Sequence, residues 1–448
     1  MVVAMSGGFR LHFGDVRLAV TSPYRLLAVA LALGLVRHWA APSAPVYRDL
    51  PRRLRTWWQA PGVKPSAAVL VGTRPAVLLE GYLAVFMIGY PDGRVPQRLS
   101  QNELVNLPSR WDAGWYLGIV LSGYEFDSRH VDRQQNIVFF PAYPLIVRGV
   151  GRLLGGGTAS YSGAGVLVSL MAFFGALIYL FNLARDMLDD DHAVAALWLL
   201  AAYPFALFYS AYYTESLYLL GVAGAFFHFT RRQYWIAALW GLLVGLTRPN
   251  GFFLSAPLAV LAVASLLPRA VVGGSRPAQP SPPWLAGAVA VAAPIIGMLV
   301  YSIYVGGLTG NPLAWVTGQI GWGRKYQGLA ALAIDRYDLV SQLGVEKYVT
   351  TLPTEALNAL GALFVLATVW PVARRLGLAY GVFILISILP PLAQGGFLSG
   401  GRFSAVLFPA FFWLAAVLPQ RQRTGWIATF AAIQGLNAAL FYTWRPLF

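Results

Sequence analysis

Residues 161–183 read YSGAGVLVSLMAFFGALIYLFNL and carry no charged side chain. This stretch is long enough to cross a bilayer as a helix, which takes about 20 mostly apolar residues. Because the same pattern recurs along the chain, the sequence predicts an all-α polytopic membrane protein with about 11 or 12 transmembrane helices. The other apolar runs lie near 24–41 (a weak one), 67–90, 193–211, 213–230, 234–248, 251–267, 284–305, 352–372, 378–394, 402–419 and 425–443.

The composition agrees with this class of protein. The chain is 57% hydrophobic and only 11% charged, whereas soluble domains are about 25% charged. It has no cysteine, which excludes disulfides and thiol chemistry within the chain. The net charge of +15 is typical of basic loops that face the cytoplasm and anionic lipid. We therefore expect membrane lipid, and no nucleic acid, as a partner.

The basic residues lie in clusters that alternate with the apolar runs. Counting crossings puts five clusters on one side of the membrane, which the positive-inside rule identifies as cytoplasmic. The opposite face is then expected to carry 91–160, 306–351 and the turns at 212–214, 248–251 and 395–401. The five clusters are Arg48, Arg52, Arg53, Arg55 and Lys64; Arg231 and Arg232; Arg269 and Arg276; Arg374 and Arg375; and Arg421 and Arg423.

The chain divides into an extension and a membrane domain. Residues 1–66 form an N-terminal extension with a weak span or an interfacial helix, and 67–448 form the transmembrane domain. Within this domain, 91–160 is a first outer loop, whose apolar end is interrupted by arginines and predicts interfacial helices. The stretch 268–283 is rich in Pro, Gly and Ser and predicts a cytoplasmic linker. Residues 306–351 form a second large outer loop.

The first outer loop contains the sequence Arg110-Trp111-Asp112-Ala113-Gly114-Trp115-Tyr116. If this segment is helical, Asp112, Trp115 and Tyr116 share one face. A lone carboxylate at the mouth of a span can act as a general base that accepts the proton of an incoming hydroxyl. Two structural alternatives remain, in which Asp112 pairs with Arg110 or caps the helix.

Four other charged residues need an explanation. Glu215 is expected at the start of a span on the same face, where it either lines a site or favours the helix N-terminus. Arg248 and Arg402 lie beside glycines on that face and either anchor the chain in the interface or bind a lipid phosphate. Glu80 is in the middle of a predicted span, where a buried acid needs a partner on another helix or a proton.

No motif signals a metal or a nucleotide. The chain has no Asp-x-Asp sequence, its five histidines do not have metal-ligand spacing, and it has no Gly-x-x-x-x-Gly-Lys motif. We therefore expect no metal and no cofactor.

Several short motifs in order resemble the PIG-V mannosyltransferases, membrane enzymes of the GT-C fold class. They extend over roughly residues 67 to 419. Eukaryotic members have Glu-His before the conserved Asn, where this chain has Gln134-Gln135, so no histidine role is implied. The motifs are Trp111-Asp112-Ala113, Gly123-Tyr124, Asn136 before Phe139-Phe140-Pro141, Tyr143-Pro144, Tyr203-Pro204, Ser210 to Leu217, Thr247 to Gly251, and Gly401-Arg402-Phe403 ahead of Phe408-Pro409.

The resemblance implies a GT-C-like fold and an inverting glycosyltransferase. Such an enzyme moves a sugar, here expected to be mannose, from a polyprenyl-phosphate donor to a glycolipid or glycoprotein acceptor on the non-cytoplasmic face. The Arg- and Ala-rich composition favours a bacterial inner membrane. The resemblance also implies that Asp112 is the catalytic acidic residue of the first outer loop and that Glu215 and Arg248 line the site.

The predicted site therefore has one catalytic residue, Asp112, and two arginines for the donor phosphate, Arg248 and Arg402. A membrane transporter or lipid flippase is the alternative function, although it would bury its ionisable residues near the bilayer midplane. A non-catalytic assembly partner is a second alternative. The residues predicted to line the substrate site are Trp111, Trp115, Tyr116, Asn136, Phe140, Tyr213, Glu215 and Asn250.

Overall fold

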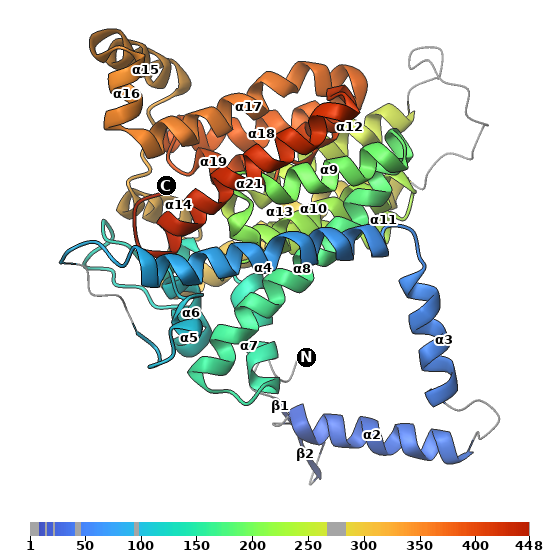
Figure 1. Ribbon diagram of the computed structural model, residues 1–448. Helices are drawn as coiled ribbons and strands as arrows, with labels where there is room; N and C mark the ends of the chain where they lie inside the picture. Colours follow the sequence, from blue (N-terminus) through green and yellow to red (C-terminus); the bar gives the residue numbers. More distant parts are fainter. Residues whose placement is uncertain are drawn as a thin grey trace.

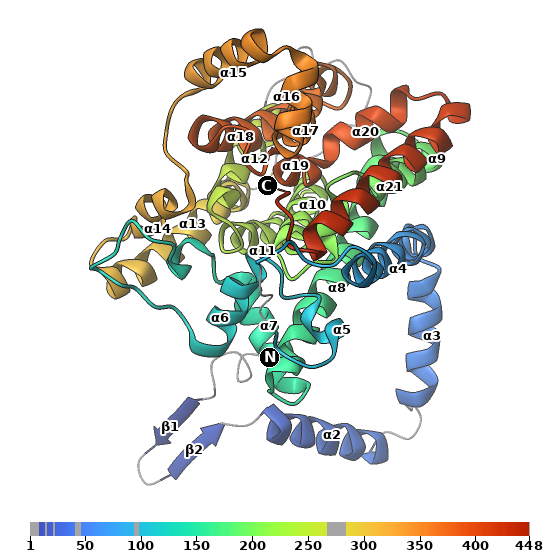
Figure 2. The ribbon, with the colours of Figure 1, turned by 60° about the vertical axis from the view of Figure 1, so that its left-hand side comes forward.

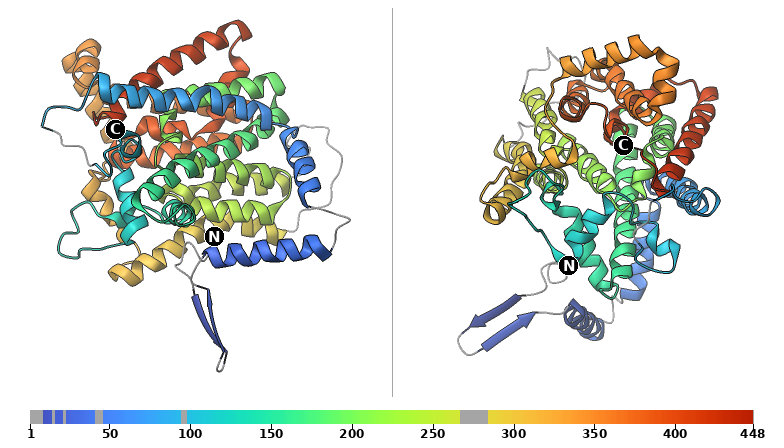
Figure 3. Two further views of the ribbon diagram at one scale, coloured as in Figure 1. Left: turned by 60° about the horizontal axis from the view of Figure 1, so that its bottom comes forward. Right: turned by 90° about the vertical axis from the view of Figure 1, so that its left-hand side faces the viewer.

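The computed structural model describes residues 9–13, 16–20, 23–40, 46–93, 98–266 and 284–447. The predicted linker 268–283 lies outside the described residues, as do Arg269 and Arg276. In the described chain every element is helical except one antiparallel hairpin, β1 (Phe9–Phe13) and β2 (Val16–Val20), which projects away from the helices (Figure 3, left). The all-α prediction is confirmed for the helical bundle, and the hairpin was not predicted.

Five described helices are long and apolar enough to cross a bilayer, which makes the chain an integral membrane protein. They run side by side in one bundle together with α21 (Gln420–Tyr442) (Figure 1). The five helices are α4 (Val63–Met87), α8 (Thr158–Met187), α13 (Trp284–Thr309), α17 (Pro353–Arg375) and α18 (Leu378–Gly395).

Apart from 425–443, which lies in the 23-residue helix α21, the remaining predicted spans fold as shorter helices. A helix of 12 residues, such as α11, is about 18 Å long, whereas the hydrocarbon core is about 30 Å thick. The 11 or 12 apolar runs therefore do not correspond to one full-length helix each. The short helices are α9 (Asp190–Ala202), α10 (Glu215–Thr230), α11 (Tyr234–Gly245), α12 (Ser255–Leu266), α19 (Gly400–Ala405) and α20 (Phe408–Val417), and α2 (Pro23–Ala40) in the N-terminal extension has 18 residues.

Breaks in three apolar runs explain why these helices are short. The breaks are the segments 203–214, 246–254 and 396–407, which contain only short helical pieces: η2 (Ala206–Tyr209), η3 (Pro249–Leu254) and α19. In the first two, Tyr203 and Arg248 have extended backbone and each precedes a proline, as sterics at that position favour. In the third, Gly396 and Ser399 have positive φ. Irregular backbone at membrane depth is tolerated only where it is buried in protein or lines a cavity.

The segment 203–214, which contains η2 (Ala206–Tyr209), is buried throughout. Its carbonyl groups, and those at the end of α9, accept hydrogen bonds from side chains of neighbouring helices. Arg74 of α4 donates to the carbonyls of Ala201 and Ala206. Two side chains of α21 supply the rest, since Gln434 donates to the carbonyls of Ala201 and Tyr203 and Asn437 donates to that of Pro204.

The two ends of the bundle differ in character. Figure 1 shows α3 (Val46–Trp58) at one end and the loop helices at the other, and Figure 2 gives a second view of the same arrangement. Ion pairs at the α3 end join Arg231 to Asp186 (2.5 Å) and Arg423 to Asp191 (2.5 Å). The described basic clusters therefore gather at one end, as predicted. The loop helices are α5 (Glu103–Asn106), α6 (Ala113–Ser122), η1 (Asn136–Val138), α7 (Ala142–Leu153), α14 (Ala314–Thr317), η5 (Gly318–Trp322), α15 (Leu329–Leu343) and α16 (Val345–Thr351).

The first outer loop differs from the prediction at Arg148. This residue was expected on the polar side of an interfacial helix. Instead its guanidinium donates to the carbonyls of Ile119 and Val120. Arg148 therefore binds two carbonyls of the last turn of α6, where a helix leaves carbonyls unpaired, although that of Ile119 also accepts the Gly123 N–H. This contact joins α7 to the helix that follows Asp112.

We predict that Arg74→Leu destabilises the folded protein. The substitution removes the side-chain donor of the buried Ala206 carbonyl and one of the two side-chain donors of the Ala201 carbonyl, and a buried polar group left without a partner costs about 1–3 kcal/mol. Thermal unfolding of the purified protein in detergent measures the effect. Arg374→Leu, at an exposed position of α17, is the matched control, and equal melting temperatures for the two variants would show that Arg74 does not support the segment.

Candidate functional site

A cavity of about 480 Å³ lies at the end of the bundle that carries the loop helices. Figure 3 (right) views the molecule from this end. Five separate segments contribute to its wall, namely 111–116, 134–140, 248–253, 315–324 and 390–403. The predicted outer segments of the chain therefore converge on one site, and two of the helix breaks supply part of its wall.

Asp112 lies in this wall and immediately precedes α6. Its side chain makes no capping hydrogen bond to the helix. Arg110 is fully buried and pairs with Glu103 (2.6 Å) rather than with Asp112. Both structural alternatives for Asp112 are therefore wrong. Trp111, between the two, has a φ of 55°, an uncommon backbone conformation for a bulky residue.

Arg402 joins Asp112 to the second acid of the site. Its Nη1 atom donates to Asp112 Oδ2 at 2.8 Å, and its Nε atom donates to Glu215 Oε1. Glu215 is completely buried, and its Oε1 atom also lies 3.3 Å from Nη2 of Arg248. Two carboxylates and two guanidinium groups thus form one ion-pair network, in which the partners of each acid come from other elements.

The network retains unused hydrogen-bonding capacity. Within the described chain, Oε2 of Glu215 and Nη1 of Arg248 are buried and have no hydrogen-bond partner. Asp112 Oδ1 has no hydrogen bond with any described residue either, and the Asp112 side chain is 18% exposed. A buried donor without a partner is costly, so the site is suited to a ligand that supplies an acceptor for Arg248.

A third arginine, Arg324, lies beside this network. Its guanidinium is 5.3 Å from the centre of the Phe403 ring, and that of Arg248 is 5.4 Å from the same ring. Its hydrogen bond is to Ser399 Oγ, at 3.3 Å. Burial, and the positive charge of Arg402, lower the pKa of Arg324 to about 10. With both acids ionised, the three arginines leave the group with a net charge of +1, which favours an anion.

The predicted lining residues divide into two sets. Trp111, Tyr116, Phe140 and Asn250 line the cavity together with Asp112, Arg248 and Arg402. The other four do not line the cavity and instead contact residues that do, or the backbone beside them. Trp115 packs on Phe139 and Trp322, and Asn136 binds the backbone of Gly123 and Glu125. Tyr213 accepts the backbone N–H of Asp112, and Glu215 reaches the cavity only through its arginines.

Sequence reasoning missed Arg324 and most of the second outer loop. Trp315, Gln319, Trp322 and Arg324 all line the cavity. One signal was available, because Arg324 follows Gly323 in the same way that Arg402 follows Gly401. Nothing in the sequence, however, relates the loop at 315–324 to Asp112, because the two are about two hundred residues apart.

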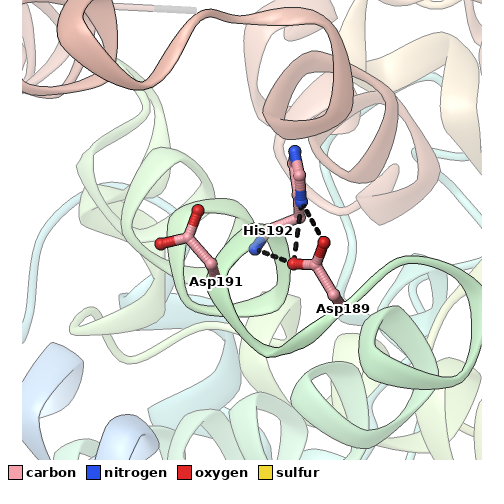
Figure 4. A group of neighbouring side chains, drawn as sticks. All are labelled: Asp189, Asp191 and His192. Atoms are coloured by element: carbon pink, nitrogen blue, oxygen red, sulfur yellow. Dashed lines mark hydrogen bonds and ion pairs between the residues drawn. The ribbon is translucent and has the colours of Figure 1, made fainter.

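A second cluster of potential ligands lies at the opposite end of the bundle. Asp189, Asp191 and His192 are close together at the start of α9 (Figure 4). Asp189 accepts the backbone N–H of His192 and pairs with its ring, and Asp191 pairs with Arg423. These contacts account for the cluster as a helix cap and an ion pair between helices.

Comparison with known proteins supports the motif analysis. Residues 91–265 match the family model of the mannosyltransferases described as PIG-V. This range contains Asp112, Glu215 and Arg248. The predicted resemblance to this family is thereby confirmed. None of the curated proteins matches the sequence.

Two solved structures are similar to the chain over most of its length. ArnT from Cupriavidus metallidurans, bound to undecaprenyl phosphate, is 13% identical with a TM-score of 0.46, over 82% of this chain and 63% of that one. The oligosaccharyltransferase AglB from Archaeoglobus fulgidus, in complex with an inhibitory peptide and a dolichol-phosphate, is 13% identical with a TM-score of 0.39, over 84% of this chain and 55% of that one. The chain spans less than two thirds of the length of either protein.

We predict that Glu103 makes the fold acid-sensitive. Burial alone would raise the pKa of this carboxyl, but hydrogen bonds from Tyr90, Arg110 and Asn106 outweigh burial and lower it. A carboxyl with a lowered pKa in the folded state stabilises the protein at neutral pH, and this contribution is lost as the pH falls through the folded-state pKa.

Melting temperatures of detergent-solubilised protein from pH 7 down to about pH 3 check this prediction, since the unfolded-state pKa of Glu is about 4.3. Wild type should lose more stability over this range than Glu103→Gln. The exposed Glu346→Gln variant should follow wild type. Parallel curves for wild type and Glu103→Gln would contradict the assignment.

Proposed function

We propose that the chain is an inverting glycosyltransferase that moves a sugar from a polyprenyl-phosphate donor to a hydroxyl acceptor. The observation that carries the proposal is the cavity in which Asp112, with one carboxylate oxygen that no described residue binds, lies beside a cluster of three arginines. The match of residues 91–265 to the PIG-V mannosyltransferases supports the reaction class and favours mannose as the sugar.

In this proposal Asp112 is the general base. Its Oδ1 atom accepts the proton of the acceptor hydroxyl while the hydroxyl oxygen forms a bond to the anomeric carbon. On the opposite face of the sugar, the bond from this carbon to the phosphate oxygen breaks, and the electron pair leaves with the phosphate. Arg402 holds the other oxygen of Asp112 and so fixes the direction of the carboxylate.

The charge of the site supports a phosphodiester as the donor. A polyprenyl-phosphate sugar carries one negative charge, which balances the net +1 of the ion-pair network and Arg324. Among the described residues, Arg248 Nη1 has no hydrogen-bond partner and Arg324 makes one hydrogen bond, at 3.3 Å. Both guanidinium groups can therefore donate to phosphate oxygens. Arg402 already bridges two acids, and its role as a phosphate ligand stays a prediction.

Apolar residues of the wall suit the lipid part of the donor. Phe252 and Phe253 of the second helix break and Pro390, Pro391 and Leu398 around the end of α18 all line the cavity. A prenyl chain can stay among apolar side chains while the headgroup reaches the arginines, so the protein needs only to orient the sugar.

The acceptor we propose is a bacterial glycolipid or glycoprotein on the non-cytoplasmic side. The described basic clusters lie at the other end of the bundle, which the positive-inside rule assigns to the cytoplasm. The alternative of a transporter or flippase is less favoured, because the acids and arginines of the cavity lie at one end of the bundle rather than near its middle.

We predict that Asp112→Asn abolishes most of the transfer without unfolding the protein. Loss of a general base lowers kcat by about 10²–10⁴-fold, and the amide is nearly isosteric with the carboxyl. Transfer of radiolabelled mannose from a polyprenyl-phosphate donor to membrane acceptors measures the activity. The control is Asp127→Asn in the exposed part of the same loop. Near-normal turnover by Asp112→Asn would remove Asp112 from the mechanism.

We predict that Arg324→Gln weakens donor binding more than it slows turnover. A hydrogen bond to a charged group contributes about 1.5–3 kcal/mol, so the donor KM should rise by about 10–100-fold. Lys325→Gln, one residue further along and exposed, should keep the wild-type KM. An unchanged donor KM in Arg324→Gln would exclude Arg324 from the phosphate site.

A further inference from the structure

Glu80 is a feature of the sequence that the proposed function does not use. It lies in the spanning helix α4, seven residues before Met87, the last residue of the helix. At 1.5 Å per residue this is about 10 Å from the end of the helix. A buried position was expected, but the side chain is exposed on the surface of the bundle. In a spanning helix, that surface faces the acyl chains of the bilayer.

No described group of the chain neutralises this acid by direct contact. Glu80 makes no hydrogen bond or ion pair with any described residue. The cations of α4 and of its neighbour α21 are Lys64, Arg74, Arg421 and Arg423. Arg74 is 2% exposed and its donors are directed at the carbonyls of the 203–214 segment. The other three lie at the far, arginine-rich end of the two helices.

Arg74 acts on Glu80 only at a distance, and an acid without a contacting cation is costly in hydrocarbon, where acids are as a rule paired or functional. Glu80 does not line the cavity, and its carboxylate lies against α21. A Cβ atom at Gly435 would be 3.2 Å from that carboxylate. A partner for Glu80 must therefore approach from the lipid side, over α4 and α21.

The surface around Glu80 permits such an approach. Gly435 is flanked along α21 by Ala432 and Ala439, which are three and four residues away and share its helix face. Small residues let the backbone of a second helix come close in a membrane. We propose that Glu80, Ala432, Gly435 and Ala439 form a docking surface for a membrane-spanning helix of another protein, which carries a lysine, arginine or histidine at the depth of Glu80.

Charge complementarity favours another protein over a second copy of this chain. A two-fold dimer would bring the same surface from both copies together. Within α4 and α21 this surface has no accessible cation, so the second copy would add a second acid rather than a neutralising charge, and like charges repel.

Labelling with dicyclohexylcarbodiimide, an apolar reagent for protonated carboxyls, tests the proposal. It adds to the carboxylic acid, and rearrangement to the stable N-acylurea leaves all atoms of the reagent on the protein. In the purified full chain in phosphatidylcholine vesicles, Glu80 should be neutral and should react. In native membranes, a bound cation should keep Glu80 ionised and covered, so labelling should fall to the background of Glu80→Gln.

Equal labelling of Glu80 in vesicles and in native membranes would overturn the proposal. Protection of the purified chain that grows with the protein-to-lipid ratio would also overturn it, because a second copy would then be the partner.

A matched pair of cross-linking sites gives an independent test. Because the chain has no cysteine, each of two substitutions introduces a single thiol. Leu436→Cys lies next to Gly435 at a position that is 59% exposed, and Leu360→Cys lies on α17 at a position that is 65% exposed. The thiol is labelled with a photoreactive maleimide and cross-linked in native membranes. Leu436→Cys should then be joined to a membrane-spanning peptide of another protein that contains a lysine, arginine or histidine, and Leu360→Cys should not. Adding Glu80→Leu should remove this cross-link, and its persistence would contradict the proposal.

The test is separable from that of the proposed function. Sugar transfer by the purified Glu80→Leu variant should equal that of wild type, because Glu80 does not touch the cavity.

Discussion

The fold depends on satisfying the backbone of an unwound segment inside the membrane. Residues 203–211 belong to the apolar run 193–211, which was predicted to be helical to its end, and in hydrocarbon each unpaired carbonyl would be costly. Arg74, Gln434 and Asn437 supply the missing donors from two neighbouring helices. This support lets the chain end α9 early, turn, and begin α10 at Glu215 in the interior of the protein.

The same arrangement determines the electrostatics of the site. Glu215 begins α10, Asp112 immediately precedes α6, and Arg402 reaches both from the third break of the bundle. Because Arg402 bridges the acids, neither is an isolated buried charge. The guanidinium groups of Arg248 and Arg324 both lie near the Phe403 ring. Together they offer more hydrogen-bond donors than the described residues around them accept. The surplus is positive, and a phosphodiester would neutralise it.

The sequence predicts the class of fold and part of the site, for identifiable reasons. Long apolar runs such as 161–183 correspond closely to helices. The basic clusters gather at one end of the bundle because they alternate with apolar runs along the chain. Asp112 could be selected because its motif resembles that of a known family, and Arg248 and Arg402 because each lies beside glycines at the edge of an apolar run. Arg324 could not be, since it lies in a polar loop where charges are ordinary. Turns were predicted at 212–214 and 395–401, but 203–211 was predicted as helix because its residues are apolar, and tertiary hydrogen bonds stabilise it in another form.

An experimental structure of the full chain bound to undecaprenyl phosphate in a lipid nanodisc tests the phosphate site and the role of Asp112 most directly. We predict phosphate density within hydrogen-bonding distance of both Arg248 and Arg324, with Asp112 still bound to Arg402 and its Oδ1 atom facing the phosphate across the space for the sugar. Phosphate bound elsewhere, with Asp112 closed off from the cavity, would contradict this prediction.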